Sequence, residues 1–136
     1  MANINLTTAD KVEVVESIIQ MTLPAAEAIT AGMAVRLDTA TGKFTLANGS
    51  AAGEARIYGA AVKTVAAGMP VTAIRKGVMD GYALSGLDYD APVYLSDTDG
   101  RLADGVGTVT VAVGRVIPGT SVTLGTAYDK LLFVDL

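Results

Sequence analysis

A ten-residue pattern occurs twice in the chain, and it constrains the fold more than any other feature of the sequence. Val35–Phe44 (VRLDTATGKF) and Val93–Leu102 (VYLSDTDGRL) lie 58 residues apart and share the pattern V-x-L-x-x-x-x-G-[KR]-[FL]. In each copy an apolar run leads into a polar cluster that ends in glycine, which is typical of a tight reversal between two β-strands. The pattern therefore predicts a β-hairpin at each place.

Both copies continue into a strand-like segment with an internal glycine. These segments are Ile57–Val62 (IYGAAV) and Ala112–Ile117 (AVGRVI), and they lie 55 residues apart. Internal repetition of this kind indicates two halves built on one hairpin plan, at about residues 29–62 and 86–117. A chance echo between two glycine-rich stretches is the alternative explanation.

Further strand signals follow at intervals of about 8–12 residues, with glycine-containing turns between them. We expect strands over Val71–Ile74 and Val78–Leu84, separated by a turn at residues 75–77. The last segment, Tyr128–Leu136, is rich in large apolar residues and would be an aggregation hazard on a bare edge, so we expect it to be central or paired. No segment is a confident helix. The sequence predicts an all-β fold, either a small β-barrel or a sandwich, with one domain over residues 24–136.

Residues 1–23 are expected to form an extended N-terminal arm followed by a first strand. Met1–Asp10 is polar, with Ile4 and Leu6 as its only apolar side chains apart from the initial Met1 and the small alanines. Lys11–Leu23 has a helical spacing of valine and isoleucine, but its many β-branched residues favour a strand. Pro24 ends either element, because proline cannot donate a hydrogen bond to a ladder.

The composition excludes much catalytic chemistry. The chain has no histidine, no cysteine and no tryptophan. Their absence removes the usual general base, the usual thiol nucleophile and the commonest transition-metal ligands. We therefore expect the protein not to be an enzyme and to hold no metal and no cofactor.

Three motifs resemble sites of known chemistry but lack residues that this chemistry needs. Asp97–Gly100 resembles the start of a calcium loop, but Leu95 and Val106 occupy the positions of its first and last carboxylates. The glycine-rich stretch 103–108 lacks the lysine and the following helix of a phosphate-binding loop. The acids between Asp88 and Asp104 could form a glycosidase pair, but the chain has few aromatic residues to hold a sugar, so these acids are interpreted as solvated loop residues.

Charge and hydropathy limit the partners. Ten Lys and Arg against fourteen Asp and Glu give a net charge of −4 without a basic cluster, so no nucleic acid is expected. Nothing resembles a signal peptide, and no apolar run approaches the ~20 residues that span a bilayer, so no membrane is expected either. Charged residues make up only 18% of the chain. Either small residues fill the surface, or other protein chains cover part of it; the second explanation is preferred.

Several short glycine-valine segments resemble the capsid cement, or head decoration, proteins of tailed bacteriophages over about residues 25–120. The segments are Ile29–Gly32 with Val35, Ala60–Val62, Ala67–Val71, Gly77–Val78, Ala91–Asp97 and Val113–Val116.

The resemblance implies a small β-rich domain, in some members a β-tulip, which usually forms a homotrimer. Such proteins are made in the host cytoplasm and lie on the outer surface of the virion, where they clamp neighbouring major capsid subunits of the expanded shell against the pressure of packaged DNA. In several of them an extended N-terminal arm adds to the shell. Ile4, Leu6, Val12 and Val14 are the expected capsid-interface residues here, and deleting Met1–Asp10 is expected to weaken binding while leaving the domain folded.

Two other classes remain open. One is a different virion or surface-layer structural module, such as a tail or fibre domain, which would share the β content and the low charge. The other is a carbohydrate-binding or hydrolytic β domain that uses the acids between Asp88 and Asp104.

Overall fold

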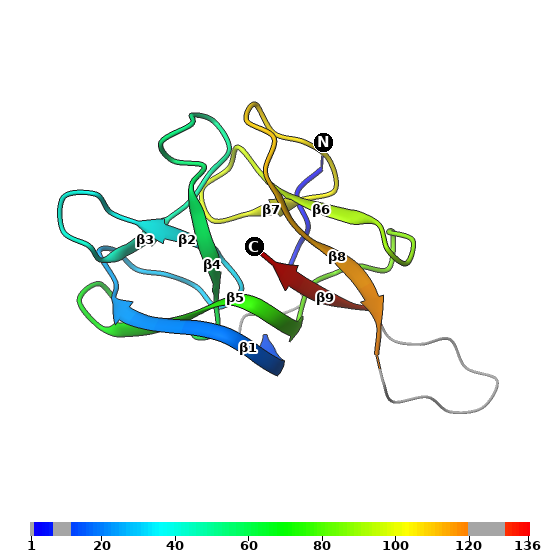
Figure 1. The fold of residues 1–136 in the computed structure, drawn as a ribbon, viewed down its shortest axis with the longest axis horizontal. Coiled ribbons are helices and arrows are strands. Elements are labelled where there is room, and N and C mark those ends of the chain that lie inside the picture. The colour runs from blue at the N-terminus through cyan, green and yellow to red at the C-terminus, as the bar shows by residue number, and fades with distance from the viewer. Residues whose placement is uncertain (1, 7–11, 120–129) are drawn as a thin grey trace.

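The computed structural model describes residues 2–6, 12–119 and 130–136, and it contains no helix within these residues. Nine strands form one antiparallel sheet that curls into a half-barrel (Figure 1). They are β1 (Glu13–Pro24), β2 (Ala34–Leu37), β3 (Phe44–Leu46), β4 (Ile57–Ala61), β5 (Pro70–Asp80), β6 (Pro92–Leu95), β7 (Leu102–Ala103), β8 (Ala112–Pro118) and β9 (Lys130–Asp135). The all-β prediction is confirmed, and the sheet curls into a half-barrel, whereas the sequence predicts a small β-barrel or a sandwich.

The sheet is arranged in two similar parts, one around β2 and one around β6. In the first part β2 pairs with β3 and β4, and in the second β6 pairs with β7 and β8. The registers correspond as well. The corresponding pairs are Leu37↔Phe44 with Leu95↔Leu102, and Val35↔Gly59 with Val93↔Gly114. The turn glycines Gly42 and Gly100 have φ angles of 70° and 71°, the left-handed conformation that glycine adopts readily.

One long strand, β5, connects the two parts. Ala73 and Ile74 pair with β4 and Lys76–Met79 pair with β9, while β1 pairs along the whole length of β5 on its opposite edge (Figure 1). The expected turn at residues 75–77 is therefore wrong, because this segment lies inside a continuous eleven-residue strand. Arg75 is left out of the β1 ladder between the Ile74 and Lys76 pairs, so the irregularity that the sequence suggested is a bulge.

The last strand is central, as the sequence indicated. β9 lies between β5 and β8, and its Leu132 and Val134 are fully buried. They belong to the larger of two hydrophobic clusters, which also contains Ile74 and Met79. The smaller cluster surrounds Phe44 under the first part of the sheet. Tyr128 and Asp129 of the predicted strand lie outside the described residues.

The N-terminal residues that the structure describes belong to the domain itself. Ile4 and Val12 are only 6% and 7% exposed and lie in the larger cluster, and Leu6 and Val14 are half-buried against it. In this conformation Ile4 and Val12 are enclosed within the domain and Leu6 and Val14 are partly enclosed, so their role as interface residues stays a prediction. Burial in the core removes these apolar side chains from water, which lowers the free energy of the folded state. A chain without residues 1–10 would lose Ile4, so such a deletion removes part of the core as well as the arm.

The strand predicted within Lys11–Leu23 is confirmed. β1 runs from Glu13 to Pro24 and pairs antiparallel with β5 through ten residue pairs, from Glu13↔Asp80 to Pro24↔Pro70. Lys11 lies outside the described residues, as do residues 7–10 of the predicted arm.

Candidate functional site

Four of the five acidic residues that the sequence singled out form hydrogen bonds or an ion pair in turns and loops. Asp97 accepts hydrogen bonds from the backbone nitrogen and the hydroxyl of Thr108, at 2.9 and 2.6 Å. The others bind different partners: Asp99 accepts from Asn48, Asp104 accepts from the backbone nitrogen of Ala2, and Asp90 pairs with Arg115. Asp88 is exposed. In residues 2–6, 12–119 and 130–136, no three acidic side chains gather where they could hold a metal ion.

The Thr108 contacts give a pH-dependent prediction. Hydrogen bonds from the side chain and the backbone of Thr108 lower the pKa of Asp97 from its ordinary value of 3.8. The folded state therefore favours the ionised carboxylate, and this stabilisation is present above the ordinary pKa and is lost as the pH falls through the lowered one. We expect the melting temperature of the wild type to fall more than that of Asp97→Asn between pH 5 and pH 2, because an amide does not titrate. The melting temperatures are measured by circular dichroism. An equal fall in melting temperature for the two proteins between pH 5 and pH 2 would contradict this.

The ends of the strand path are covered by other parts of the chain. At one end, Ile4 donates its backbone N–H to the Leu102 oxygen of β7, at 2.8 Å. At the other, Ala26 donates to the Phe44 oxygen of β3, at 2.7 Å. β1 differs, because its outer edge pairs with no other strand of the described residues. An open edge of this length is what soluble proteins usually cover or interrupt.

Two bulges interrupt β1 and place apolar side chains in solvent. The ladder to β5 skips Val15, between the Val14 and Glu16 pairs, and it skips Ile18, between the Ser17 and Ile19 pairs. A bulge adds a residue to one strand and redirects its side chain. Val15 and Ile18 are 51% and 55% exposed, and Ile19 and Met21 are exposed as well.

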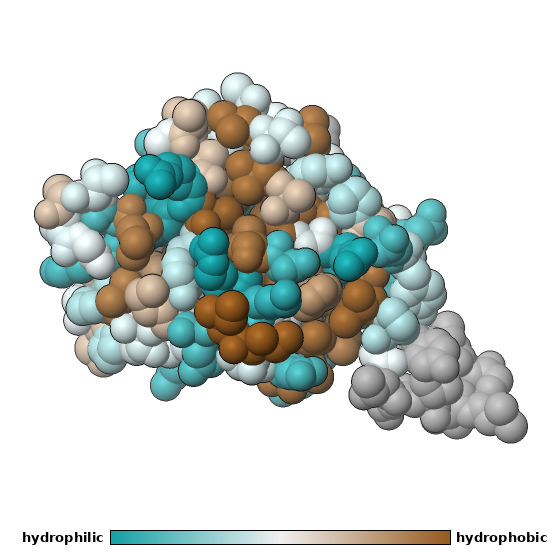
Figure 2. Space-filling view, in the orientation of Figure 1, coloured by the Kyte–Doolittle hydropathy of each residue, from teal (hydrophilic) through white to brown (hydrophobic). Residues whose placement is uncertain are grey.

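These four side chains, Val15, Ile18, Ile19 and Met21, are called the β1 stripe below. Figure 2 shows hydrophobic residues gathered over β1 on the face of the molecule that is in view. Isolated exposed apolar residues are normal, whereas large contiguous apolar patches are typical of interaction sites. The charged residues of β1, Glu13 and Glu16, precede most of the stripe.

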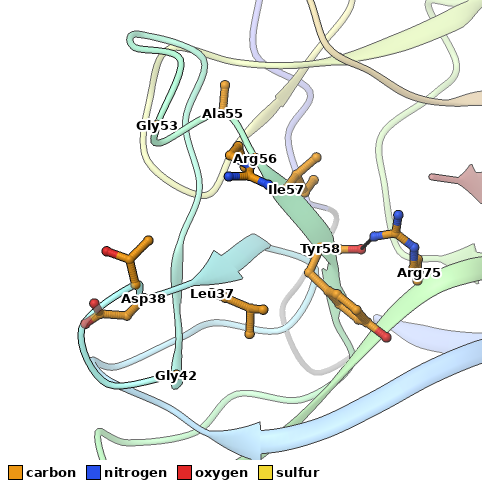
Figure 3. Close-up of a pocket in the computed structure, with 10 residues that line it drawn as sticks. Leu37, Asp38, Gly42, Gly53, Ala55, Arg56, Ile57, Tyr58 and Arg75 are labelled. Atoms are coloured by element: carbon orange, nitrogen blue, oxygen red, sulfur yellow. Dashed lines mark hydrogen bonds between the residues drawn. The ribbon is translucent and has the colours of Figure 1, made fainter.

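A groove of about 700 Å³ lies in the first part of the sheet, between the β2–β3 hairpin and β4 (Figure 3). Its wall includes Leu37, Tyr58 and two arginines, Arg56 and Arg75. Tyr58 also contacts the ring of Phe44, with the ring centres 5.4 Å apart.

Sequence reasoning missed both surfaces. The β1 stripe is visible only in part, as apolar residues that follow one another where a half-buried strand would alternate. The bulges that turn Val15 and Ile18 outward depend on the pairing with β5. The groove has no signal in the sequence, because it forms where residues 37–42, 53–58 and 75 meet.

Comparison with known proteins adds no identification. No protein-family model matches the chain, and no curated protein is significantly similar to it. The part of the chain that the structure describes contains no helix of the length and hydrophobicity needed to cross a membrane.

Proposed function

We propose that this chain is a structural protein of a tailed-bacteriophage virion, which binds the outer surface of the expanded capsid and links neighbouring major capsid subunits. In this proposal it acts as a cement protein without catalysis, without a cofactor and without contact with nucleic acid or membrane. The half-barrel sheet, with its two hairpin-based parts, would be a β-tulip-like domain.

The observation that carries the proposal is the β1 stripe on the open edge of the sheet. A protein that works only by attachment needs an exposed apolar surface, because removal of apolar area from water supplies most of the free energy of association. Val15 and Ile18 project from bulges, so they are available to a partner without any rearrangement of the fold.

The β1 stripe takes the place of the interface residues that the sequence suggested. Because Ile4 and Val12 are buried within the domain, a contact through them would require the N-terminal segment to leave the core. A contact through β1 requires no such change. The regular half of β1, from Gln20 to Pro24, pairs with β5 in unbroken register and leaves its outer edge open to an added strand of the capsid protein.

Composition supports attachment on the outside of a shell. The low charged fraction of 18% is compatible with a surface that other chains cover. The net charge of −4 suits a protein separated from the packaged DNA by the capsid wall. If the chain is a homotrimer, three β1 stripes would engage adjacent subunits together, and effective concentration would strengthen contacts that are individually weak.

Co-sedimentation with capsid shells tests this function. The purified protein would be mixed with expanded and with unexpanded shells of the same phage, and the bound fraction measured by quantitative gel analysis. We expect saturable binding to the expanded shells alone, in multiples of three per local three-fold position.

Binding to neither form of shell would contradict the proposal. Binding to purified tails or fibres instead would assign the chain to the alternative class of virion module. Saturable binding in a glycan screen, lost in Asp97→Asn and Asp99→Asn, would indicate a carbohydrate-binding domain.

A further inference from the structure

The groove beside β4 contains two cations without an acidic partner. Arg56 is exposed, and its side chain forms no hydrogen bond or ion pair within the described part of the chain. The guanidinium carbon (Cζ) of Arg75 lies 5.3 Å from the centre of the Tyr58 ring. The same guanidinium donates one long hydrogen bond, 3.4 Å, to the Tyr58 backbone oxygen. By contrast, Arg115 in the second part of the sheet pairs with Asp90 at 3.2 Å. Neither Arg56 nor Arg75 therefore forms an ion pair within the described residues, in a chain that carries excess acid overall.

The one carboxylate on the groove wall is engaged elsewhere. Asp38 accepts a hydrogen bond from the backbone nitrogen of Ala40 at 3.0 Å, within its own turn. That bond, with smaller contributions from Thr41 and from the charge of Arg36, lowers the pKa of the Asp38 carboxyl. In Figure 3 Asp38 lies at the hairpin end of the groove, opposite Arg75. Asp38 forms no ion pair with either arginine of the groove.

In the second part of the sheet, the positions that correspond to the groove wall are covered by other side chains of the domain. Three residues on the groove wall have register equivalents around β6, β8 and β9 that are fully buried. The equivalent pairs are Leu37 with Leu95, Tyr58 with Val113, and Arg75 with Val134. In the second part the chain itself covers these positions as part of the larger cluster. In the first part Leu37 is 44% exposed, and the groove lies where the second part has covering side chains.

We propose that this groove binds an extended segment of a partner polypeptide that carries a carboxylate beside an apolar side chain. Arg56 and Arg75 bind the carboxylate through charge-assisted hydrogen bonds, for which guanidinium groups are well shaped. Leu37 and Tyr58 receive the apolar side chain.

A polypeptide carboxylate fits the groove better than a polyphosphate does. The net charge of −4 repels a polyanion, and the groove has two arginines but no glycine-rich loop of backbone N–H donors. Its apolar wall has no use in binding a free phosphate. The proposal holds whether or not the partner is a capsid subunit.

Nuclear magnetic resonance titration of the full-length chain tests the proposal. The probe is the peptide acetyl-leucyl-glutamyl-leucyl amide, and its matched control carries glutamine in place of glutamate. We expect the glutamyl peptide to shift the side-chain Nε–H signals of Arg56 and Arg75 and the backbone signals of Leu37 and Tyr58, with saturation. The glutaminyl peptide should bind at least about tenfold more weakly, because it lacks the charge.

Variants locate the interaction. Arg56→Gln and Arg75→Gln should each weaken binding of the glutamyl peptide at least about tenfold. Lys63→Gln, which removes one positive charge from an exposed position outside the groove wall, should leave it unchanged. Arg56 is exposed and has no partner to lose, so Arg56→Gln keeps the test valid even if Arg75→Gln unfolds.

Four results would overturn the proposal. They are equal binding of both peptides, shifts confined to other surfaces, inorganic phosphate binding at the same arginines as tightly as the glutamyl peptide, and self-association of the wild type that Arg56→Gln abolishes. The last result would identify the occupant as a second copy of this chain. Shell binding by the β1 variants described in the Discussion tests the proposed function alone, and neither outcome decides whether the groove binds a carboxylate peptide.

Discussion

Replacing Gly114 with alanine is expected to destabilise the protein by about 3 kcal/mol or more and to lower its melting temperature by roughly 10 °C or more. Gly114 lies in β8, where it pairs with Val93 of β6 on one side and Val134 of β9 on the other. A Cβ atom at this position would overlap the carbonyl oxygen of Phe133 and lie 2.9 Å from its carbonyl carbon. Backbone atoms cannot move aside as a flexible side chain can, so β8 and β9 would have to separate.

A matched glycine provides the control. Gly86 lies in a turn and has no atom within 4 Å of the position that a Cβ would take. We expect Gly86→Ala to change the free energy of unfolding by no more than about 0.5 kcal/mol. Calorimetric melting of the two variants and the wild type makes the measurement. An unchanged melting temperature for Gly114→Ala would show that β9 does not lie this close to β8.

Gly59 is the register equivalent of Gly114 in the first part of the sheet, and the same crowding occurs there. A Cβ on Gly59 would overlap the carbonyl oxygen of Ile74. Both glycines stood out in the sequence as interruptions of strand-like segments. Their physical reason, a neighbouring backbone too close for a side chain, is seen only in the structure.

The sequence predicted the local elements well, because their signals are local. The V-x-L pattern and the turn glycines predicted the two hairpins, and the structure adds their register, which pairs Leu37 with Phe44 and Leu95 with Leu102. β-branched residues identified β1 as a strand in spite of its helical spacing.

What could not be predicted depends on residues far apart in the chain. The segment around Arg75 looks like a turn by composition, but it lies within a strand because β1, β4 and β9 all pair with β5. Ile4 and Val12 look like residues of a free arm, and their burial depends on neighbours such as Tyr82. The exposure of Val15 and Ile18 follows from bulges set by the register with β5.

The β1 stripe gives the largest expected effect on binding. Val15→Ser combined with Ile18→Ser should reduce affinity for expanded shells by about a hundredfold or more, since each buried apolar side chain contributes about 1.5–3 kcal/mol. Both side chains are more than half exposed in the free protein, so the double variant should melt at nearly the wild-type temperature. The comparison is made by co-sedimentation at a series of protein concentrations.

Val106→Ser is the control for this variant. Val106 is 51% exposed, as Val15 is, but it lies in the loop between β7 and β8. It should leave shell binding unchanged. Equal affinities for the wild type and the Val15/Ile18 double variant would remove β1 from the contact.

Hydrogen exchange of the bound protein tests most directly whether β1 is the attachment face. The protein would be exchanged in deuterated buffer, free and on saturated expanded shells, then digested and analysed by mass spectrometry. We expect slower exchange in peptides covering Glu13–Pro24 on the shell, with little change in the turn at residues 96–100. Protection confined to that turn or to other loops, with β1 exchanging as in the free protein, would contradict it.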